Sequence, residues 1–347
     1  MGLPQIMIKF KTAGGTAIRR SARGQVVLLL PGEESGSISL TRLDQADRAL
    51  VGEEGWLLLQ LCFLGNPAKV HLVTYAAGEE STALAGCGKT AEGGWLCAPA
   101  MEAGTVADFV RLARKQGRPL RAVVSCGSSP DCAGVVNFTT QGIVLRLEEE
   151  RVAVTSAQYC ARIAGILAGI SLRESATYYP LAEVEGFTAH ADPEGEIARG
   201  CLILDQGSES ARLARAVTSL VSGGDSAFRK IKITEGMDLI QADIRSVFES
   251  EYVGKVLNDY DSKLLLVTAV NSYFAGLEGS VLDTGHRSQA SVDLEAQRAF
   301  LEAQGVDTDG MSDTAILSAN TGSQVFLRAD VRFADAMEDL TFEIAMQ

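Results

Sequence analysis

Two runs of alternating apolar and polar residues late in the sequence predict β-strands, because a side-chain period of two is typical of a strand with one buried face. The first run places five apolar side chains on one face: Val325, Leu327, Ala329, Val331 and Phe333. The second run, at residues 340–346, does the same with Leu340, Phe342, Ile344 and Met346. We expect the first run to join the sheet of its own domain, and the second run needs a strand to pair with.

A similar alternation occurs near the start of the sequence, at about residues 5–11. There Ile6, Ile8 and Phe10 alternate with a methionine and two lysines, ahead of a flexible Ala-Gly-Gly. Such a strand needs a partner, since its exposed N–H and C=O groups invite pairing with another chain. Two interpretations stay open from the pattern: the terminal strands pair within one sheet of the same chain, or they are donated between subunits.

The stretch between these strands divides into three regions by pattern. Short apolar runs separated by turn residues, such as VVLLL and KVHLVTY around PGEESGS and GNP, predict a small β-rich module over residues 25–87, a compact sandwich or barrel. From Trp95 the pattern changes to a strand, a helix that Thr105 would cap, and a second strand at 120–124. A helix at about 156–172 and a strand at 201–204 continue this alternation, so residues 88–222 are predicted to form an α/β domain.

Residues 223–347 predict a different kind of domain. Ile233, Met237, Ile240, Ile244 and Val247 form a helical stripe that must be buried, and two more helices follow before the alternating strands. We therefore expect a multidomain fold, α/β and α+β, with an N-terminal arm (1–24), the β-rich module, the α/β domain, and a C-terminal α+β assembly domain.

Composition narrows the function. The 347 residues carry a net charge of −13, which repels phosphate backbones and argues against nucleic-acid binding. The seven cysteines are scattered in apolar runs, as expected of buried reduced thiols in a cytoplasmic protein, and none has metal-site spacing. No secretory leader opens the sequence, and the apolar stretch 161–172 is too short to span a bilayer. Its Gly165 and Gly169 are expected to let another backbone pack closely.

No stretch of the sequence carries a complete nucleotide-binding, metal-binding or catalytic motif. The string AGCGKT at residues 85–90 has Ala83 where a phosphate loop requires glycine, and the aspartates at 307–313 lack calcium-loop spacing. His190 could be tuned as a base by Asp192 and Glu194, although a loop histidine beside a helix start is the commoner explanation. We expect no catalytic residues, no metal and no cofactor. The remaining enzyme hypothesis is a cytoplasmic α/β enzyme with a cleft in residues 88–222, near Cys126, His190 or Lys89.

One basic cluster, Arg229, Lys230 and Lys232, stands out in the acidic chain. Such a cluster is usually a solvated face. In a protein that assembles, it could instead set the register against an acidic partner.

Three strings, TAIRRSARGQVVLLL, FRKIKITEGMDLIQADIRSVFESEYVGKVLND and VFLRADVRFADAMEDLTFEIAMQ, resemble contractile phage tail sheath proteins, especially those of Gram-positive phages and defective prophages. The resemblance runs through the chain and is strongest in the first 30 residues and from about Phe228 onward. It implies a structural virion protein that is not an enzyme, made and assembled in the cytoplasm of the bacterial host.

The resemblance also implies partners. Sheath subunits form hexameric rings in a helical lattice around a tail tube and contract to drive the tube through a cell envelope. Baseplate and tail terminator proteins would be further partners, with no nucleic acid and no membrane. The donated strands map to Ile6–Phe10 and Leu340–Met346, and the basic cluster becomes a possible tube contact. A phage-tail bacteriocin or related injection system would use the same subunit architecture.

Overall fold

The computed structural model describes residue 18 and residues 24–223 and 226–346. The chain divides into two compact units. One, here called the α/β unit, comprises described residues 24–223, 226–242 and 335–346, and the other, the α+β unit, comprises described residues 18 and 243–334. The chain passes from the first unit to the second within a single helix, so the division differs from the boundary expected at residue 223.

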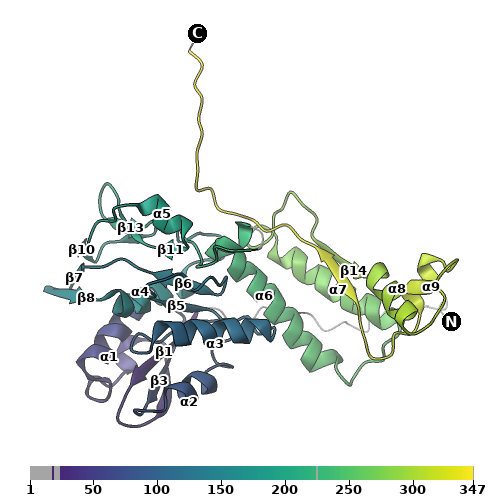
Figure 1. Ribbon diagram of the computed structural model, residues 1–347, viewed down its shortest axis with the longest axis horizontal. Coiled ribbons are helices and arrows are strands. Elements are labelled where there is room, and N and C mark those ends of the chain that lie inside the picture. Colours follow the sequence, from purple (N-terminus) through teal and green to yellow (C-terminus); the bar gives the residue numbers. More distant parts are fainter. Residues whose placement is uncertain (1–17, 19–23, 224–225, 347) are drawn as a thin grey trace, which may run out of the picture. The chain divides into compact units, whose positions relative to one another are not determined.

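A seven-stranded sheet forms the centre of the α/β unit (Figure 1), in the order β11-β6-β5-β4-β1-β3-β2. All neighbours are parallel except β2 and β3. The strands are β1 (Gln25–Pro31), β2 (Gly36–Leu40), β3 (Lys69–Tyr75), β4 (Trp95–Cys97), β5 (Ala122–Val124), β6 (Val135–Phe138) and β11 (Cys201–Leu202).

Helices cover both faces of this sheet. The buried side chains of α1 (Arg48–Phe63) and α4 (Ser156–Gly169) form one apolar cluster with one face of the sheet. Those of α2 (Glu80–Gly86) and α3 (Ala103–Lys115) form a second cluster on the other. Strand β1 is buried on both faces, with Val26 to Leu30 at 0–3% exposure, because parallel strands sandwiched by helices contact apolar side chains on each side.

The β-rich module expected at residues 25–87 is therefore wrong as a separate sandwich or barrel. Its first apolar run is β1, an interior strand of the large sheet between β4 and β3, and the run WLLLQLCFL belongs to α1. A short continuous apolar run fits a buried strand and a buried helix equally well. Asp47 caps the first turn of α1, since its side chain accepts a hydrogen bond from the Ala49 N–H (2.9 Å), and the helix is kinked at Gly52 ahead of this run.

Helices α1 and α4 approach closely at two glycines, as expected from the sequence. A Cβ atom at Gly165 would lie 2.0 Å from the Cys62 carbonyl oxygen, and one at Gly169 would lie 1.9 Å from that of Gly65. Glycine is required there because a side chain would displace the backbone opposite. No helix in the described part of the chain is long and apolar enough to cross a bilayer.

Smaller elements complete the α/β unit. Strands β7 (Ile143–Leu147), β8 (Glu150–Val154) and β10 (Val184–Gly186) form a three-stranded sheet, and β9 (Pro180–Leu181), β12 (Leu204–Gln206) and β13 (Ala211–Leu213) form another. The short helix α5 (Pro193–Ala198) begins at Asp192, whose carboxylate accepts from the Gly195 N–H at 3.0 Å.

Helix α6 (Ile231–Val247) starts within the α/β unit and is held to it by buried charges. Arg114 donates two hydrogen bonds to the carboxylate of Asp238, at 2.7 and 2.8 Å. Arg121 lies 2.9 Å from Glu235 and stacks over the ring of Trp95 at 4.9 Å. Breaking one partner of such a buried pair is costly, because the remaining charge stays desolvated.

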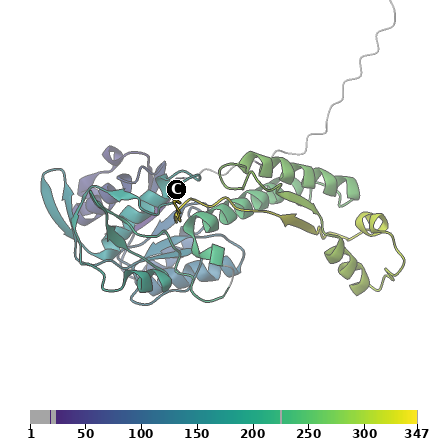
Figure 2. The same cartoon turned by 90° about the horizontal axis from the view of Figure 1, so that it is seen from above.

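The α+β unit combines helices with one antiparallel strand pair, β14 (Gln289–Val292) and β15 (Leu327–Asp330). After α6 come a π-helical turn (Phe248–Tyr252), α7 (Tyr260–Leu277), α8 (Leu294–Ala303) and α9 (Asp313–Ser318). Figure 2 shows α7 lying alongside the strand pair, and α7 packs against β14. The first alternating run of the sequence is thus confirmed as a strand of the subunit's own sheet, with Phe333 continuing it by a bridge to Leu282.

Thiol reactivity should follow the burial of the cysteines. All seven are free, and burial raises the pKa of the Cys62 thiol to about 12 and that of Cys87 to about 11. Burial also raises the pKa of Cys126 and Cys201, but these two are partly exposed. Because the thiolate is the nucleophile, iodoacetamide at pH 8 is expected to label Cys126 and Cys201 first, as read by peptide mass spectrometry. Equal labelling of Cys62 in the native protein would contradict this order.

Candidate assembly surfaces

The segment Leu340–Met346, here called the C-terminal arm, is extended and exposed. Its four alternating apolar side chains, Leu340, Phe342, Ile344 and Met346, are 89%, 76%, 70% and 94% exposed. Figure 1 shows the segment running away from the ribbon of its unit, and it pairs with no strand of the described chain. An unpaired strand of this composition is a template for association with another chain.

Residues Asp335–Asp339, here called the arm root, contact the α/β unit just before the arm begins. Lys230 forms an ion pair with Asp335 and lies 3.5 Å from a carboxylate oxygen of Glu338. Arg215 pairs with Asp339. The root is therefore fixed at several points, whereas the arm beyond it is not.

The three basic side chains of the cluster expected from the sequence all have polar partners within the chain. Besides the pairing of Lys230, Arg229 donates a hydrogen bond to the Val221 carbonyl, and Lys232 donates one to the Leu172 carbonyl. The other predicted assembly strand, with Ile6, Ile8 and Phe10, lies outside the described residues.

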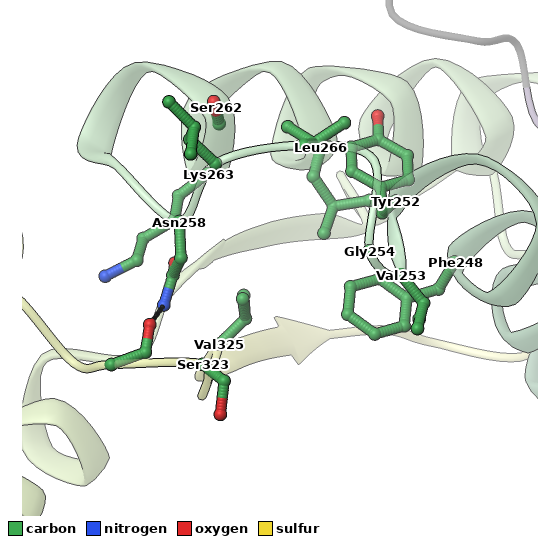
Figure 3. Close-up of a pocket in the computed structure, with 13 residues that line it drawn as sticks. Phe248, Tyr252, Val253, Gly254, Asn258, Ser262, Lys263, Leu266, Ser323 and Val325 are labelled. Atoms are coloured by element: carbon green, nitrogen blue, oxygen red, sulfur yellow. Dashed lines mark hydrogen bonds between the residues drawn. The ribbon is translucent and has the colours of Figure 1, made fainter.

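An apolar groove of about 460 Å³ opens on the α+β unit beside the start of α7 (Figure 3). Three of its apolar side chains are well exposed: Val253 (56%), Val256 (45%) and Leu257 (81%). Its remaining lining comes from the π-helical turn, from α7 and from the segment before β15, with Phe248, Leu266 and Val325 as further apolar members. Exposed apolar side chains gathered around a hollow are typical of an interaction site.

Polar groups at one end of the groove shape its edge. Figure 3 shows the Asn258 amide pointing at the segment before β15, where its nitrogen donates to the carbonyls of Gly322 (2.8 Å) and Gln324 (2.9 Å). The Asn258 Oδ1 is buried and has no partner among the described residues. Lys263 is 2% exposed and donates to Gln297 (3.1 Å), and burial lowers the pKa of its amine.

The backbone on the strand side of the groove is open. Neither the N–H nor the C=O group of Ser323 or Val325 has a hydrogen-bond partner in the part of the chain that the structure describes. Ser323 lies in the turn before β15, and Val325 stands two residues before the strand begins, so this open backbone adjoins β15. An added strand could pair with such an edge while its side chains enter the groove.

One group of side chains, around His190, has the arrangement of a catalytic triad and bears on the enzyme hypothesis. The Thr140 hydroxyl lies 2.9 Å from His190 Nε2, and Glu196 Oε2 lies 2.9 Å from His190 Nδ1, the order of a nucleophile, a base and an acid. Glu196 takes the place expected for Asp192 or Glu194. Thr140, however, is fully buried and its Oγ1 accepts the Leu204 N–H at 2.8 Å, so the hydroxyl cannot meet a substrate.

The carboxyl ends of the parallel strands give the enzyme hypothesis no further support. In doubly wound sheets ligands bind there, where the strand order reverses, which here is between β1 and β4. The hollow near that edge measures about 120 Å³ and is lined mainly by apolar residues such as Ala98, Met101 and Val124. Lys89 does not line it, and within the described residues no three or more His, Cys, Asp or Glu side chains are grouped to hold a metal ion.

Comparison with known proteins gives a consistent result. Residues 224–347 match the family of the phage tail sheath C-terminal domain. A tail sheath protein of Clostridium phage phiCD119 is 29% identical across 99% of this chain and 99% of its own. The chain is similar to tail sheath proteins over its whole length. The resemblance inferred from the sequence is thereby confirmed, and it points to a structural rather than an enzymatic role.

Solved sheath structures share the fold. The sheath tail protein of Desulfitobacterium hafniense superposes with a TM-score of 0.66 at 16% identity, over 83% of this chain and 94% of that one. The helical sheath of the anti-feeding prophage, in its contracted state, gives a TM-score of 0.71 at 12% identity over the full length of both chains. The predicted fold class, α/β combined with α+β, is confirmed.

Proposed function

We propose that this protein is the subunit of a contractile tail sheath, which polymerises as hexameric rings in a helical lattice around a tail tube and contracts to drive the tube through a cell envelope. The observation that carries the proposal is the exposed C-terminal arm, in a chain similar to tail sheath proteins over its whole length. Contraction in this proposal is a rearrangement of rigid subunits that stay linked by their arms. No cofactor takes part.

The arm of one copy is proposed to enter the groove of a second copy. An extended strand repeats its side-chain direction every two residues, so Leu340, Phe342 and Ile344 present one apolar face. The groove offers an apolar floor together with the open backbone edge at Ser323 and Val325. These are the two requirements of strand addition, since backbone pairing gives affinity and side-chain pockets give specificity.

The charge of the arm fits the same arrangement. Glu343 is the sole charged residue of Leu340–Met346, and it alternates with the apolar side chains. It therefore lies on the opposite face of the strand and would stay in contact with solvent while the apolar face enters the groove.

Blocking the groove tests this pairing. The variant Leu257→Glu places a charge on a side chain that is 81% exposed, so the monomer is expected to stay folded. Because burying an unpaired carboxylate in the groove is costly, we expect the number of tubes counted by electron microscopy to fall at least about tenfold. Val306→Glu is the matched control, because Val306 is 42% exposed in the same unit and does not line the groove. Normal tubes from Leu257→Glu would rule out the groove as the receptor.

Two further assignments rest on the sequence and on the resemblance. Residues 6–10 are proposed as a second donated strand, so removing residues 1–11 should prevent tube formation and leave a folded monomer. Arg229, Lys230 and Lys232 are proposed to contact the tail tube. Because Lys230 also pairs with the arm root, Arg229→Glu tests the tube contact with less disturbance of the arm. Unchanged binding of this variant to purified tube in a pull-down would contradict the assignment.

The particle that contains the sheath is proposed to be a phage virion, assembled in the host cytoplasm, with baseplate and tail terminator proteins at the two ends of the sheath. The second candidate is a contractile injection system without a genome. This second candidate is retained because the chain superposes over its full length on the sheath of the anti-feeding prophage. Electron microscopy of particles induced from the host separates the two, because only a phage carries a DNA-filled head.

A further inference from the structure

We propose that Glu338 is a positioning residue, which holds the arm root in a socket on the α/β unit and so fixes where the C-terminal arm leaves the subunit. The proposal rests on the proposed sheath function and adds a device that presents the arm. Glu338 stands out because its side chain is only 6% exposed, whereas Met337 before it is fully exposed and the Asp339 side chain after it is 76% exposed.

The socket provides hydrogen bonds suited to a carboxylate. Glu338 Oε1 accepts from the Ser175 hydroxyl at 2.8 Å and from the Thr177 hydroxyl at 2.6 Å. The other oxygen, Oε2, is buried, has no hydrogen-bond partner among the described residues and lies 3.5 Å from the Lys230 ammonium. A buried carboxylate is tolerated only where charge and hydrogen bonds replace water, and these three side chains supply both.

The socket itself is fixed by the fold of the α/β unit. Thr177 Oγ1 also accepts the Ala216 N–H at 3.0 Å, which ties the loop carrying Ser175 and Thr177 to the segment after β13. Lys230 directly precedes α6, the helix that Arg114 and Arg121 hold in place. The groups that receive Glu338 are therefore held by contacts of their own within the α/β unit.

Two ion pairs flank Glu338. Asp335 pairs with Lys230, and Asp339 pairs with Arg215. The ion pairs raise the pKa of Lys230 against the opposing effect of its burial, and Asp339 raises the pKa of Arg215. Both pairs are partly exposed and contribute little by themselves, so the buried Glu338 is the contact on which docking depends.

Docking the root matters because the arm is proposed to pair with a second copy. A free chain loses conformational freedom when it enters a groove, and fixing its first residue in advance reduces that cost. If the root were not docked, the residues that follow Asp339 would sample a much wider range of positions. The socket therefore raises the rate at which the arm finds its partner without contributing a contact to the interface.

The first experiment measures docking in the monomer. A fluorescent dye is attached at Thr341→Cys in a background of Cys126→Ser and Cys201→Ser, and its anisotropy reports arm mobility. Glu338→Gln keeps the shape and removes the charge, so the ratio of docked to free root is expected to fall about tenfold and the anisotropy to drop. Ser175→Ala tests the same contact from the socket side. The matched control is Glu343→Gln, which makes the same chemical change in the exposed arm and should leave the anisotropy unchanged.

The second experiment measures assembly by light scattering and electron microscopy. Glu338→Gln is expected to lengthen the lag before tubes appear, whereas Glu343→Gln is the reference for a lost arm charge outside the socket. Unchanged anisotropy in Glu338→Gln and Ser175→Ala would overturn the socket. If the anisotropy falls but the lag of Glu338→Gln matches that of Glu343→Gln, the positioning role is overturned. If the parent protein forms no tubes at all, the proposed sheath function fails while the anisotropy result still stands.

Discussion

Ending the chain after Asp339 is expected to abolish tube formation and leave the monomer as stable as before. The removed side chains are 70–94% exposed, so the folded monomer loses almost no packing. If a neighbouring copy buries these side chains, the truncation removes about 1.5–3 kcal/mol of association free energy for each large apolar one. That loss is enough to remove a lattice contact. Thermal unfolding monitors the monomer, and electron microscopy monitors the tubes.

The truncation has a matched pair of point variants. Phe342→Ser with Ile344→Ser removes the apolar face of the arm, whereas Thr341→Ser with Ala345→Ser changes the opposite face and keeps its size nearly constant. Only the first pair is expected to prevent tubes, because alternate residues point to opposite sides of a strand. Tubes of normal length from the truncated chain would refute the role of the arm, and equal effects of the two pairs would refute the role of its apolar face.

Replacing Gly165 by alanine is expected to destabilise the α/β unit by about 1–3 kcal/mol, the usual cost of inserting an extra group into a close-packed core. The added methyl group would lie 2.0 Å from the Cys62 carbonyl oxygen, so α1 and α4 must move apart. Urea unfolding followed by circular dichroism measures the loss. The larger valine is expected to cost more.

Gly276 in α7 is the control for this substitution, since a Cβ atom there meets no other atom within 4 Å. Gly276→Ala should leave stability unchanged or raise it by up to about 1 kcal/mol through helix propensity. An unchanged urea midpoint for Gly165→Ala would show that the two helices separate without cost, and the close approach would then have no structural importance.

The sequence predicted the alternation of the α/β unit because its pattern is local. Strand β4, helix α3 and strand β5 follow one another along the chain with turn signals between them. The same approach failed for residues 25–87, where WLLLQLCFL shows no amphipathic period. Helix α1 packs on the central sheet and also on α4. It therefore lacks the polar stripe by which a surface helix is recognised in a sequence.

The assembly surfaces were predictable to different degrees. The arm was found because alternation of Leu340, Phe342, Ile344 and Met346 is visible in the sequence itself. The groove was missed, since Val253 and Leu257 lie in an irregular segment with no period. The socket of Glu338 was missed as well, because Ser175, Thr177 and Lys230 are far from it in sequence and nothing in their spacing relates them. The charge of Lys230 was noticed, but its partner could not be read from the pattern.

The location of the socket determines how tension would travel through the subunit. A neighbour that pulls on the arm would load Glu338, and the force would enter the α/β unit through Ser175, Thr177 and Lys230. From Lys230 it would pass into α6, which the buried Arg121 and the partly buried Arg114 anchor to the α/β unit. The strand pair β14–β15, joined mainly by backbone hydrogen bonds, would be spared. The subunit would then carry tensile load through its largest core.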